Sequence, residues 1–121
     1  TKIYNLLLGA ALTVAQAVGV AAAERAGLDM AQVAGLIRSG APGSPIVQSK
    51  LGAMLSHSYA DTNFALRWMH KDATYALRAA DAHGVPMPTL AAARELYRMA
   101  RNLGLDTADF AAVFEALRHH P

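Results

Sequence analysis

Lys2 and Asn5 are the residues of this chain whose types and spacing most clearly permit chemistry. Three residues apart on a helix, an ammonium and a carboxamide share one face. The pKa of a lysine shifts readily under burial and neighbouring charge, so such a lysine can pass a proton. Both residues stand at the head of an uncharged run from Leu6 to Ala23, which predicts a polar site at the beginning of a long apolar helix. Because a chain end frays, a site there indicates a piece of a longer protein.

A second group of candidates lies in the middle of the chain. Lys71 and Asp72 are adjacent, and Phe64 lies two helical turns before Asp72. On a helix Phe64 and Asp72 would lie on roughly the same side, so an aromatic wall and a carboxylate could face one cleft. The alternative is that Lys71 and Asp72 form a solvated pair on an outer helical face. The spacing permits both interpretations.

Other catalytic and ligand-binding patterns are incomplete. The residues at 40–44 lack the glycine pattern and the preceding strand of a dinucleotide loop or P-loop. Ser44 could be paired with a remote histidine as a nucleophile, but no nucleophile elbow surrounds it, and we expect it to cap a helix. The histidines do not fall at i, i+4 on one helix with a carboxylate, so no metal site is predicted. They are His57, His70, His83, His119 and His120.

Composition narrows the class of protein. A chain of 121 residues predicts a single domain with a real core. The absence of cysteine excludes disulfides and thiolate zinc sites, and it is compatible with a cytoplasmic protein. Eleven basic and nine acidic residues give a net charge of +2 without a basic run, so nucleic acid is not an expected partner.

The uncharged run from Leu6 to Ala23 is long enough to span a membrane. About half of it is Ala or Gly, which gain little from transfer into lipid, and Thr13 and Gln16 interrupt the rest. A buried central helix explains the run better, because its small residues let other helices approach closely. We therefore expect a core helix and no membrane partner.

All local signals are helical, which predicts an all-α fold with about six helices. The expected helices cover approximately residues 3–26, 30–39, 45–55, 63–82, 88–102 and 107–117. The first should end at Gly27, a residue type that supplies a left-handed C-cap. The expected N-caps of later helices are Asp29, Ser44, Asp61 or Thr62, and Asp106 with Thr107.

Several segments, in order, resemble the C-terminal helical domain of the β-hydroxyacid dehydrogenases. That family includes 3-hydroxyisobutyrate dehydrogenase, tartronate semialdehyde reductase and glyoxylate reductase. The segments cover most of the chain and are Thr1–Leu8, Ala23–Asp29, Ser39–Ser44, Phe64–Asp72, Gly84–Pro88 and Gly104–Asp109. The resemblance implies a fold like the C-terminal domain of 6-phosphogluconate dehydrogenase.

The resemblance also implies roles for individual residues. Lys2 would be the catalytic general acid/base, Asn5 and Phe64 would contact substrate, and Lys71 and Asp72 would lie near the nicotinamide cofactor. NAD or NADP would be held mainly by an N-terminal Rossmann domain that is absent from these residues, so the chain alone should turn over nothing. The helical domain would also supply the contact of a homodimer. Retention of Lys2 argues against the imine-reducing relatives.

Leu6 departs from the family pattern, which usually has Asn or Gln at this place. A leucine cannot hydrogen-bond a substrate hydroxyl or carboxylate, so the departure suggests a less polar hydroxyacid or aldehyde substrate. The alternative is a catalytically silent helical module that keeps the fold and serves as a scaffold. Leu6 favours that alternative, and Lys2 opposes it.

Overall fold

The computed structural model describes residues 2–118, with side chains from residue 5 onward. Over these residues the chain forms helices and no strand, so the all-α prediction is confirmed. The elements are α1 (Lys2–Arg25), α2 (Met30–Ser39), α3 (Pro45–Ser56), α4 (Leu66–His83), α5 (Pro88–Asn102), the 3-10 helix η1 (Phe110–Val113) and α6 (Phe114–Arg118).

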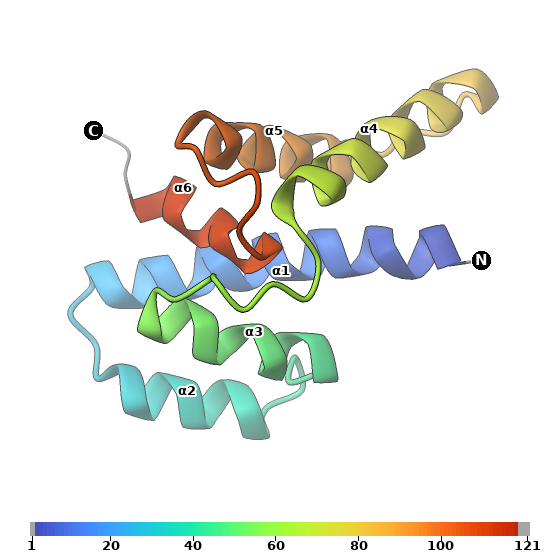
Figure 1. Cartoon of the computed structure of the whole chain (residues 1–121). Helices are drawn as coiled ribbons and strands as arrows, with labels where there is room; N and C mark the ends of the chain where they lie inside the picture. The colour runs from blue at the N-terminus through green and yellow to red at the C-terminus, as the bar shows by residue number, and fades with distance from the viewer. Residues whose placement is uncertain (1, 119–121) are drawn as a thin grey trace.

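Helix α1 runs through the middle of the domain (Figure 1). The antiparallel pair of α2 and α3 lies on one side of it, and α4, α5 and α6 lie on the other. Every later helix contacts α1, and α4 and α5 also pack closely against each other. This arrangement confirms the expected central helix.

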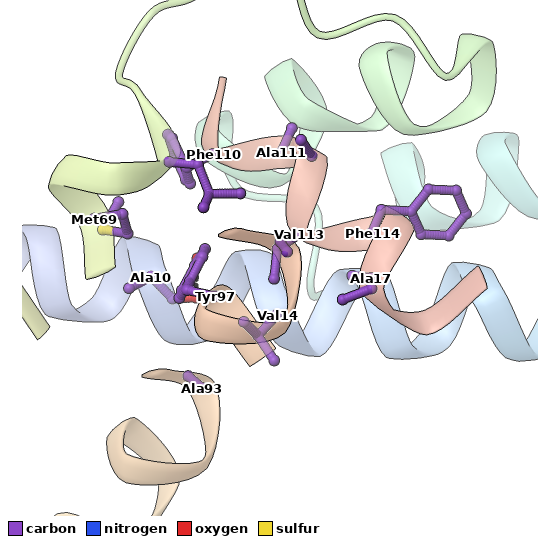
Figure 2. Packing of buried hydrophobic residues seen from close by; sticks show 14 of the residues in the cluster. Ala10, Val14, Ala17, Met69, Ala93, Tyr97, Phe110, Ala111, Val113 and Phe114 are labelled. Atoms are coloured by element: carbon purple, nitrogen blue, oxygen red, sulfur yellow. Dashed lines mark hydrogen bonds between the residues drawn. The ribbon is translucent and has the colours of Figure 1, made fainter. Parts of the chain in front are cut away.

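The buried face of α1 is built from small residues. Ala10, Val14, Ala17 and Val20 are buried against the helices on both sides. Figure 2 shows three of them facing side chains from α5, η1 and α6. The small side chains let the backbones approach, and the larger ones opposite fill the space. By length and composition α1 could also cross a membrane, but its packing makes it the core helix of this domain.

Tyr97 of α5 is a core residue that hydrogen-bonds the backbone of α1. Its hydroxyl is fully buried and donates a hydrogen bond to the carbonyl oxygen of Ala10 at 2.9 Å. Burial, with a smaller contribution from the carboxylate of Asp109, raises the pKa of Tyr97 above its ordinary value. The hydroxyl therefore stays neutral and keeps its proton for this bond.

Two of the predicted helix caps are confirmed. The carboxylate of Asp29 accepts a hydrogen bond from the amide of Ala31 at 3.0 Å, and the hydroxyl of Ser44 accepts from the amide of Val47 at 3.3 Å. Pro45 follows Ser44 at the first helical position, where its missing N–H is not needed. Gly27 has φ +73°, as expected for a residue that ends a helix in the left-handed region.

The predicted start of the fourth helix is wrong. It begins at Leu66 rather than Asn63, and neither Asp61 nor Thr62 caps it. The amides of Leu66 and Arg67 donate instead to the carbonyl oxygens of Ala108 and Asp106, at 2.8 and 3.1 Å. A distant segment of backbone thus replaces the side-chain cap, and residues 63–65 remain outside the helix.

The predicted last helix also needs correction. Residues 110–113 form the 3-10 helix η1 and only 114–118 are α-helical. The cap is Asp109, whose carboxylate accepts from the amide of Ala111 at 3.0 Å, and not Asp106 with Thr107. Asp106 is used elsewhere, because its carboxylate binds Arg101 at 2.9 Å.

Gly43, in the turn between α2 and α3, should not tolerate a side chain. A Cβ there would lie 2.6 Å from the carbonyl oxygen of Ile37 and 2.9 Å from that of Arg38. Since both obstacles are backbone atoms, we expect Gly43→Ala to lower the free energy of unfolding by about 1–3 kcal/mol, the usual cost of overpacking. Urea denaturation measures the change.

Gly52 provides the matched control for this experiment. It is exposed within α3, and a Cβ there would meet no atom within 4 Å. Gly52→Ala should raise the free energy of unfolding by about 0.5–1 kcal/mol, because glycine loses more backbone entropy in a helix than alanine does. Equal effects of the two substitutions would contradict the packing described for Gly43.

Candidate functional site

A cleft of about 430 Å³ opens beside the first turns of α1. It is bounded by the beginnings of α1, α3 and α4, by residues 63–64 just before α4, and by η1. The residues that line it are Asn5, Leu6, Gly9, Ile46, Asn63, Phe64, Met69 and Phe110. Asn5 and Phe64, two predicted substrate-binding residues from distant parts of the chain, therefore meet at one cleft.

The wall of this cleft is mainly apolar. Phe64 and Phe110 meet edge to face, with ring centroids 6.3 Å apart and an interplanar angle of 80°. Leu6 is half-buried and lines this cleft, together with the two predicted substrate-binding residues. The side chains that can donate hydrogen bonds from the lining are the carboxamides of Asn5 and Asn63. The cleft therefore suits a small ligand with an aliphatic part and one or two polar groups.

A buried ion pair lies behind the cleft. Nζ of Lys50 is 3.0 Å from Oδ2 and 3.2 Å from Oδ1 of Asp109, and the two side chains are only 7% and 3% exposed. The same ammonium lies 4.4 Å from the centroid of the Phe110 ring. The ion pair joins α3 to the residue that precedes η1, so it connects two walls of the cleft.

Asp109 also binds the backbone of residues 63–64, which form part of the cleft wall. Its Oδ1 accepts hydrogen bonds from the amides of Asn63 and Phe64, at 3.0 and 3.2 Å. With the bond from Ala111 to Oδ2, every acceptor position of the carboxylate is used. Such a satisfied buried charge is costly to disturb, because removing any partner leaves a charge or a donor unpaired.

The sequence reasoning assigned no role to Lys50 or Asp109. A signal existed, since Lys50 falls among Val47, Leu51 and Met54 on the apolar face of its helix. A lysine within such a stripe needs a buried partner. The identity of that partner depends on the tertiary fold, and so helical periodicity could not supply it.

Lys71 does not lie at the cleft. Its ammonium is 5.2 Å from the ring centroid of Trp68 and 5.6 Å from that of Tyr75, on the outer face of α4. There it lines a second depression of about 350 Å³, here called the outer hollow. The outer hollow is lined by Arg67, Trp68, His70, Lys71, Thr74, Tyr75, Arg78 and Arg101.

The outer hollow is positively charged. Arg67, Lys71 and Arg78 stack on the two aromatic rings rather than on acidic side chains. Burial, followed by the charge of Arg101, lowers the pKa of His70, so its imidazole is neutral at pH 7 and adds no further charge. The donor set is one that fits a phosphate group.

Asp72 lies on a different side of α4 from Lys71, because adjacent helical residues point about 100° apart. It is half-buried and is among the lining residues of neither the cleft nor the outer hollow. It follows Trp68 of the outer hollow by four residues and Met69 of the cleft by three, so on the helix it lies between the two depressions.

The side chain of Lys2 lies outside the described residues. Its backbone forms the first residue of α1, immediately before the part of the helix that lines the cleft. Among the residues that the structure describes, no three His, Asp or Glu side chains gather as metal ligands. The described side chains that line the cleft offer carboxamide groups, aromatic rings and aliphatic surface.

Comparison with known proteins decides the family. The sequence model described as "NAD-binding of NADP-dependent 3-hydroxyisobutyrate dehydrogenase" matches residues 1–117. The chain belongs to this family. Glyoxylate/succinic semialdehyde reductase 1 of Arabidopsis thaliana is 34% identical over 116 residues, which make up 96% of this chain and 39% of the reductase. The resemblance read from the sequence is confirmed.

Two solved structures share the fold. 3-Hydroxyisobutyrate dehydrogenase from Salmonella typhimurium has a TM-score of 0.88 at 24% identity, over 94% of this chain and 40% of that one. Psf3 in complex with NADP+ and 2-OPP has a TM-score of 0.79 at 22% identity, over 96% of this chain and 40% of that one. This chain therefore spans well under half the length of the proteins it matches.

Proposed function

We propose that this chain is the helical, cleft-forming domain of an NAD(P)-dependent oxidoreductase that interconverts a β-hydroxyacid and its aldehyde or keto form. The observation that carries the proposal is the meeting of Asn5 and Phe64 at one cleft beside the head of α1. Family membership supports the chemistry, since the family model is described as NAD-binding. The N-terminal domain that completes the enzyme would be a Rossmann domain.

Lys2 is the proposed general acid/base. In the reductive direction the Lys2 ammonium would give a proton to the carbonyl oxygen, which becomes the hydroxyl; the hydride for the carbonyl carbon would come from NAD(P)H, held mainly by the N-terminal domain. The positive charge also stabilises the alkoxide as it develops. In the oxidative direction the neutral amine takes the hydroxyl proton back. Spacing supports this role, because Lys2 precedes the cleft residue Asn5 by one helical turn.

The remaining site residues are proposed to bind the substrate or the cofactor and to enclose the cleft. Asn5 donates a hydrogen bond to a substrate oxygen, and Phe64 covers the reacting atoms and keeps water out. Lys71 and Asp72 are the proposed contacts of this domain with the cofactor. The cations of the outer hollow support the assignment for Lys71, because they fit the cofactor's phosphates. Most of the cofactor would be held by the N-terminal domain.

The activity is tested on the whole oxidoreductase of which this chain is part. NADH and NADPH oxidation is followed at 340 nm with glyoxylate, succinic semialdehyde and branched β-hydroxyacid aldehydes as substrates. We expect turnover of at least one of them, and no turnover by the 121-residue chain alone. Inactivity of the whole protein toward all of them would contradict the proposal. So would micromolar binding of NADH to the isolated chain in a calorimetric titration.

Leu6 should influence the choice of substrate. It lines the cleft, and its side chain offers no hydrogen bond to a second polar group. We expect Leu6→Asn to shift the ratio of kcat/KM values toward small polar hydroxyacids by roughly 10-fold, about the effect of one pocket contact. Steady-state kinetics on a paired series of small and branched substrates measures the ratio. An unchanged ratio would show that Leu6 does not select substrate.

A second candidate function is a catalytically silent scaffold with this fold, and the apolar lining at Leu6 favours it. The whole protein would then bind partners without turnover. The activity assay above discriminates, because a scaffold oxidises neither NADH nor NADPH.

A homodimer is the proposed assembly in either case. The outer stripe of α1 exposes Leu8, Leu12 and Val18, at 61%, 40% and 48%. Apolar side chains on an uncharged helical face favour contact with another protein surface. The stripe is the proposed contact for the second subunit or for the N-terminal domain, and light scattering on the whole oxidoreductase tests the dimer.

A further inference from the structure

Asn63 is a second carboxamide at the cleft, and nothing in the sequence reasoning singled it out. A hydroxyacid carries a carboxylate in addition to the oxygen that reacts, and a carboxylate entering an apolar cleft needs hydrogen-bond donors. Among the side chains that the structure describes, which do not include that of Lys2, the lining has no lysine, arginine or histidine. Among these lining side chains, the donors for two separate groups are Asn5 and Asn63.

The backbone of Asn63 is fixed although its side chain is exposed. Its amide donates to Oδ1 of Asp109 at 3.0 Å, and the neighbouring amide of Phe64 donates to the same atom at 3.2 Å. Asp109 is in turn held by the ammonium of Lys50, on a helix whose residue Ile46 lines the same cleft. A donor on a fixed backbone binds better than one on a mobile loop, because less entropy is lost on binding.

We propose that Asn63 is a substrate-binding residue that donates a hydrogen bond to the carboxylate of the hydroxyacid, and that Lys50 and Asp109 are the residues that position it. This inference rests on the proposed function and names its substrate class. The ligand carries one carboxylate, held by Asn63, and an aliphatic remainder that lies against Leu6, Ile46 and Met69.

The binding role is tested by Asn63→Ala in the whole oxidoreductase. We expect kcat/KM for the best hydroxyacid to fall about 10- to 100-fold, mainly through a higher KM, because a binding site that loses a hydrogen-bond donor leaves the substrate group unpaired. Asp61→Ala is the matched control, two residues away, exposed and outside the lining. It should stay within twofold of the parent. An Asn63→Ala enzyme within twofold of an active parent overturns the inference.

Failure of the role proposed for Asn63 can be distinguished from failure of the proposed oxidoreductase activity. A parent that turns over no hydroxyacid defeats the proposed activity, and the inference is then tested on the 121-residue chain with 3-hydroxyisobutyrate as the probe. The side-chain amide resonance of Asn63 should shift on titration, and the shift at neighbouring lining residues should be lost in Asn63→Ala. Identical titrations of the two chains overturn the inference.

The positioning role is tested with two double variants that carry no buried charge. Lys50→Met with Asp109→Asn keeps one oxygen that can accept from the amides of Asn63 and Phe64, whereas Lys50→Met with Asp109→Leu keeps none. We expect the KM of the first to remain within about threefold of the parent and that of the second to rise roughly tenfold, with kcat retained in both. Equal KM values in two folded variants overturn the positioning role.

Hydrogen exchange adds a measurement that needs no activity. The amides of Asn63 and Phe64 should exchange faster in the Leu double variant than in the Asn double variant, while amides in the middle of α5 stay equally protected. Uniform protection at 63 and 64 in both variants overturns the positioning role. If the Leu double variant fails to fold, Lys50→Met with Asp109→Ala, which also keeps no acceptor and no buried charge, takes its place in the same comparison.

Discussion

Asp109→Ala is expected to lower the free energy of unfolding of this chain by about 3–5 kcal/mol, the usual effect of breaking a buried ion pair. The substitution leaves the ammonium of Lys50 buried without a counter-charge. It also removes the acceptor for the amides of Asn63, Phe64 and Ala111. Both penalties act in the same place, because one carboxylate serves the cation and the three backbone donors. Urea denaturation followed by circular dichroism measures the loss.

Two comparisons identify the cause of this loss. Asp61→Ala, at an exposed position, should change the free energy of unfolding by less than about 0.5 kcal/mol. Lys50→Met with Asp109→Leu should be more stable than Asp109→Ala alone, because no unpaired charge remains buried. A double variant no more stable than the single one would assign the effect to the lost backbone acceptors and not to the charge.

Lys2→Ala is expected to slow hydride transfer in the whole oxidoreductase by roughly 10²- to 10⁴-fold, the usual contribution of a positioned general acid. The alkoxide that forms as hydride arrives would have neither a proton donor nor a positive charge beside it. Cofactor affinity should not change, because the cofactor is proposed to rest mainly on the other domain. Stopped-flow absorbance at 340 nm separates the transfer step from product release.

Arg25→Ala provides the control for this prediction. Arg25 is the last residue of α1 and is exposed, far along the same helix from the cleft. Its removal takes away one positive charge from α1 without touching the cleft. A slowing as large as that of Lys2→Ala would show that the net charge of the helix matters, rather than an amine at its head.

Local patterns were sufficient to predict most of the fold. The apolar run of α1, the residue Gly27 after it, and the caps Asp29 and Ser44 are features of adjacent residues, and the structure bears them out. Helical periodicity and capping depend on contacts within a few residues, which the sequence displays directly.

The errors in the fold come from long-range contacts. Residues 63 and 64 stay outside the helix because Asp109, far along the chain, accepts their amides, and α4 starts late because the backbone near Ala108 satisfies its first donors. The segment after Asp109 tightens into η1 because it must fit between α1, α3 and α5. No spacing in the sequence reports which distant carboxylate or carbonyl will reach a given amide.

Only part of the predicted site lies at one cleft of the structure. Asn5 and Phe64 line one cleft, whereas Lys71 lines the outer hollow. The roles of the predicted site residues all stay predictions; these residues are Lys2, Asn5, Phe64, Lys71 and Asp72. The contacts of Asn63 and the buried partner of Lys50 could not be predicted from the sequence, because they form only where residues 63–64, α3 and the residue before η1 meet.

Rescue of Lys2→Ala by small amines is the most direct test of proton transfer at this domain. Methylamine or ethylamine is added to the variant enzyme at saturating cofactor and substrate, and single-turnover hydride transfer is recorded. The rate should rise with the concentration of added amine and should not rise in the parent enzyme. A Lys2→Ala enzyme that transfers hydride as fast as the parent, or one that no amine accelerates, would contradict an amine at the head of α1 as the proton donor.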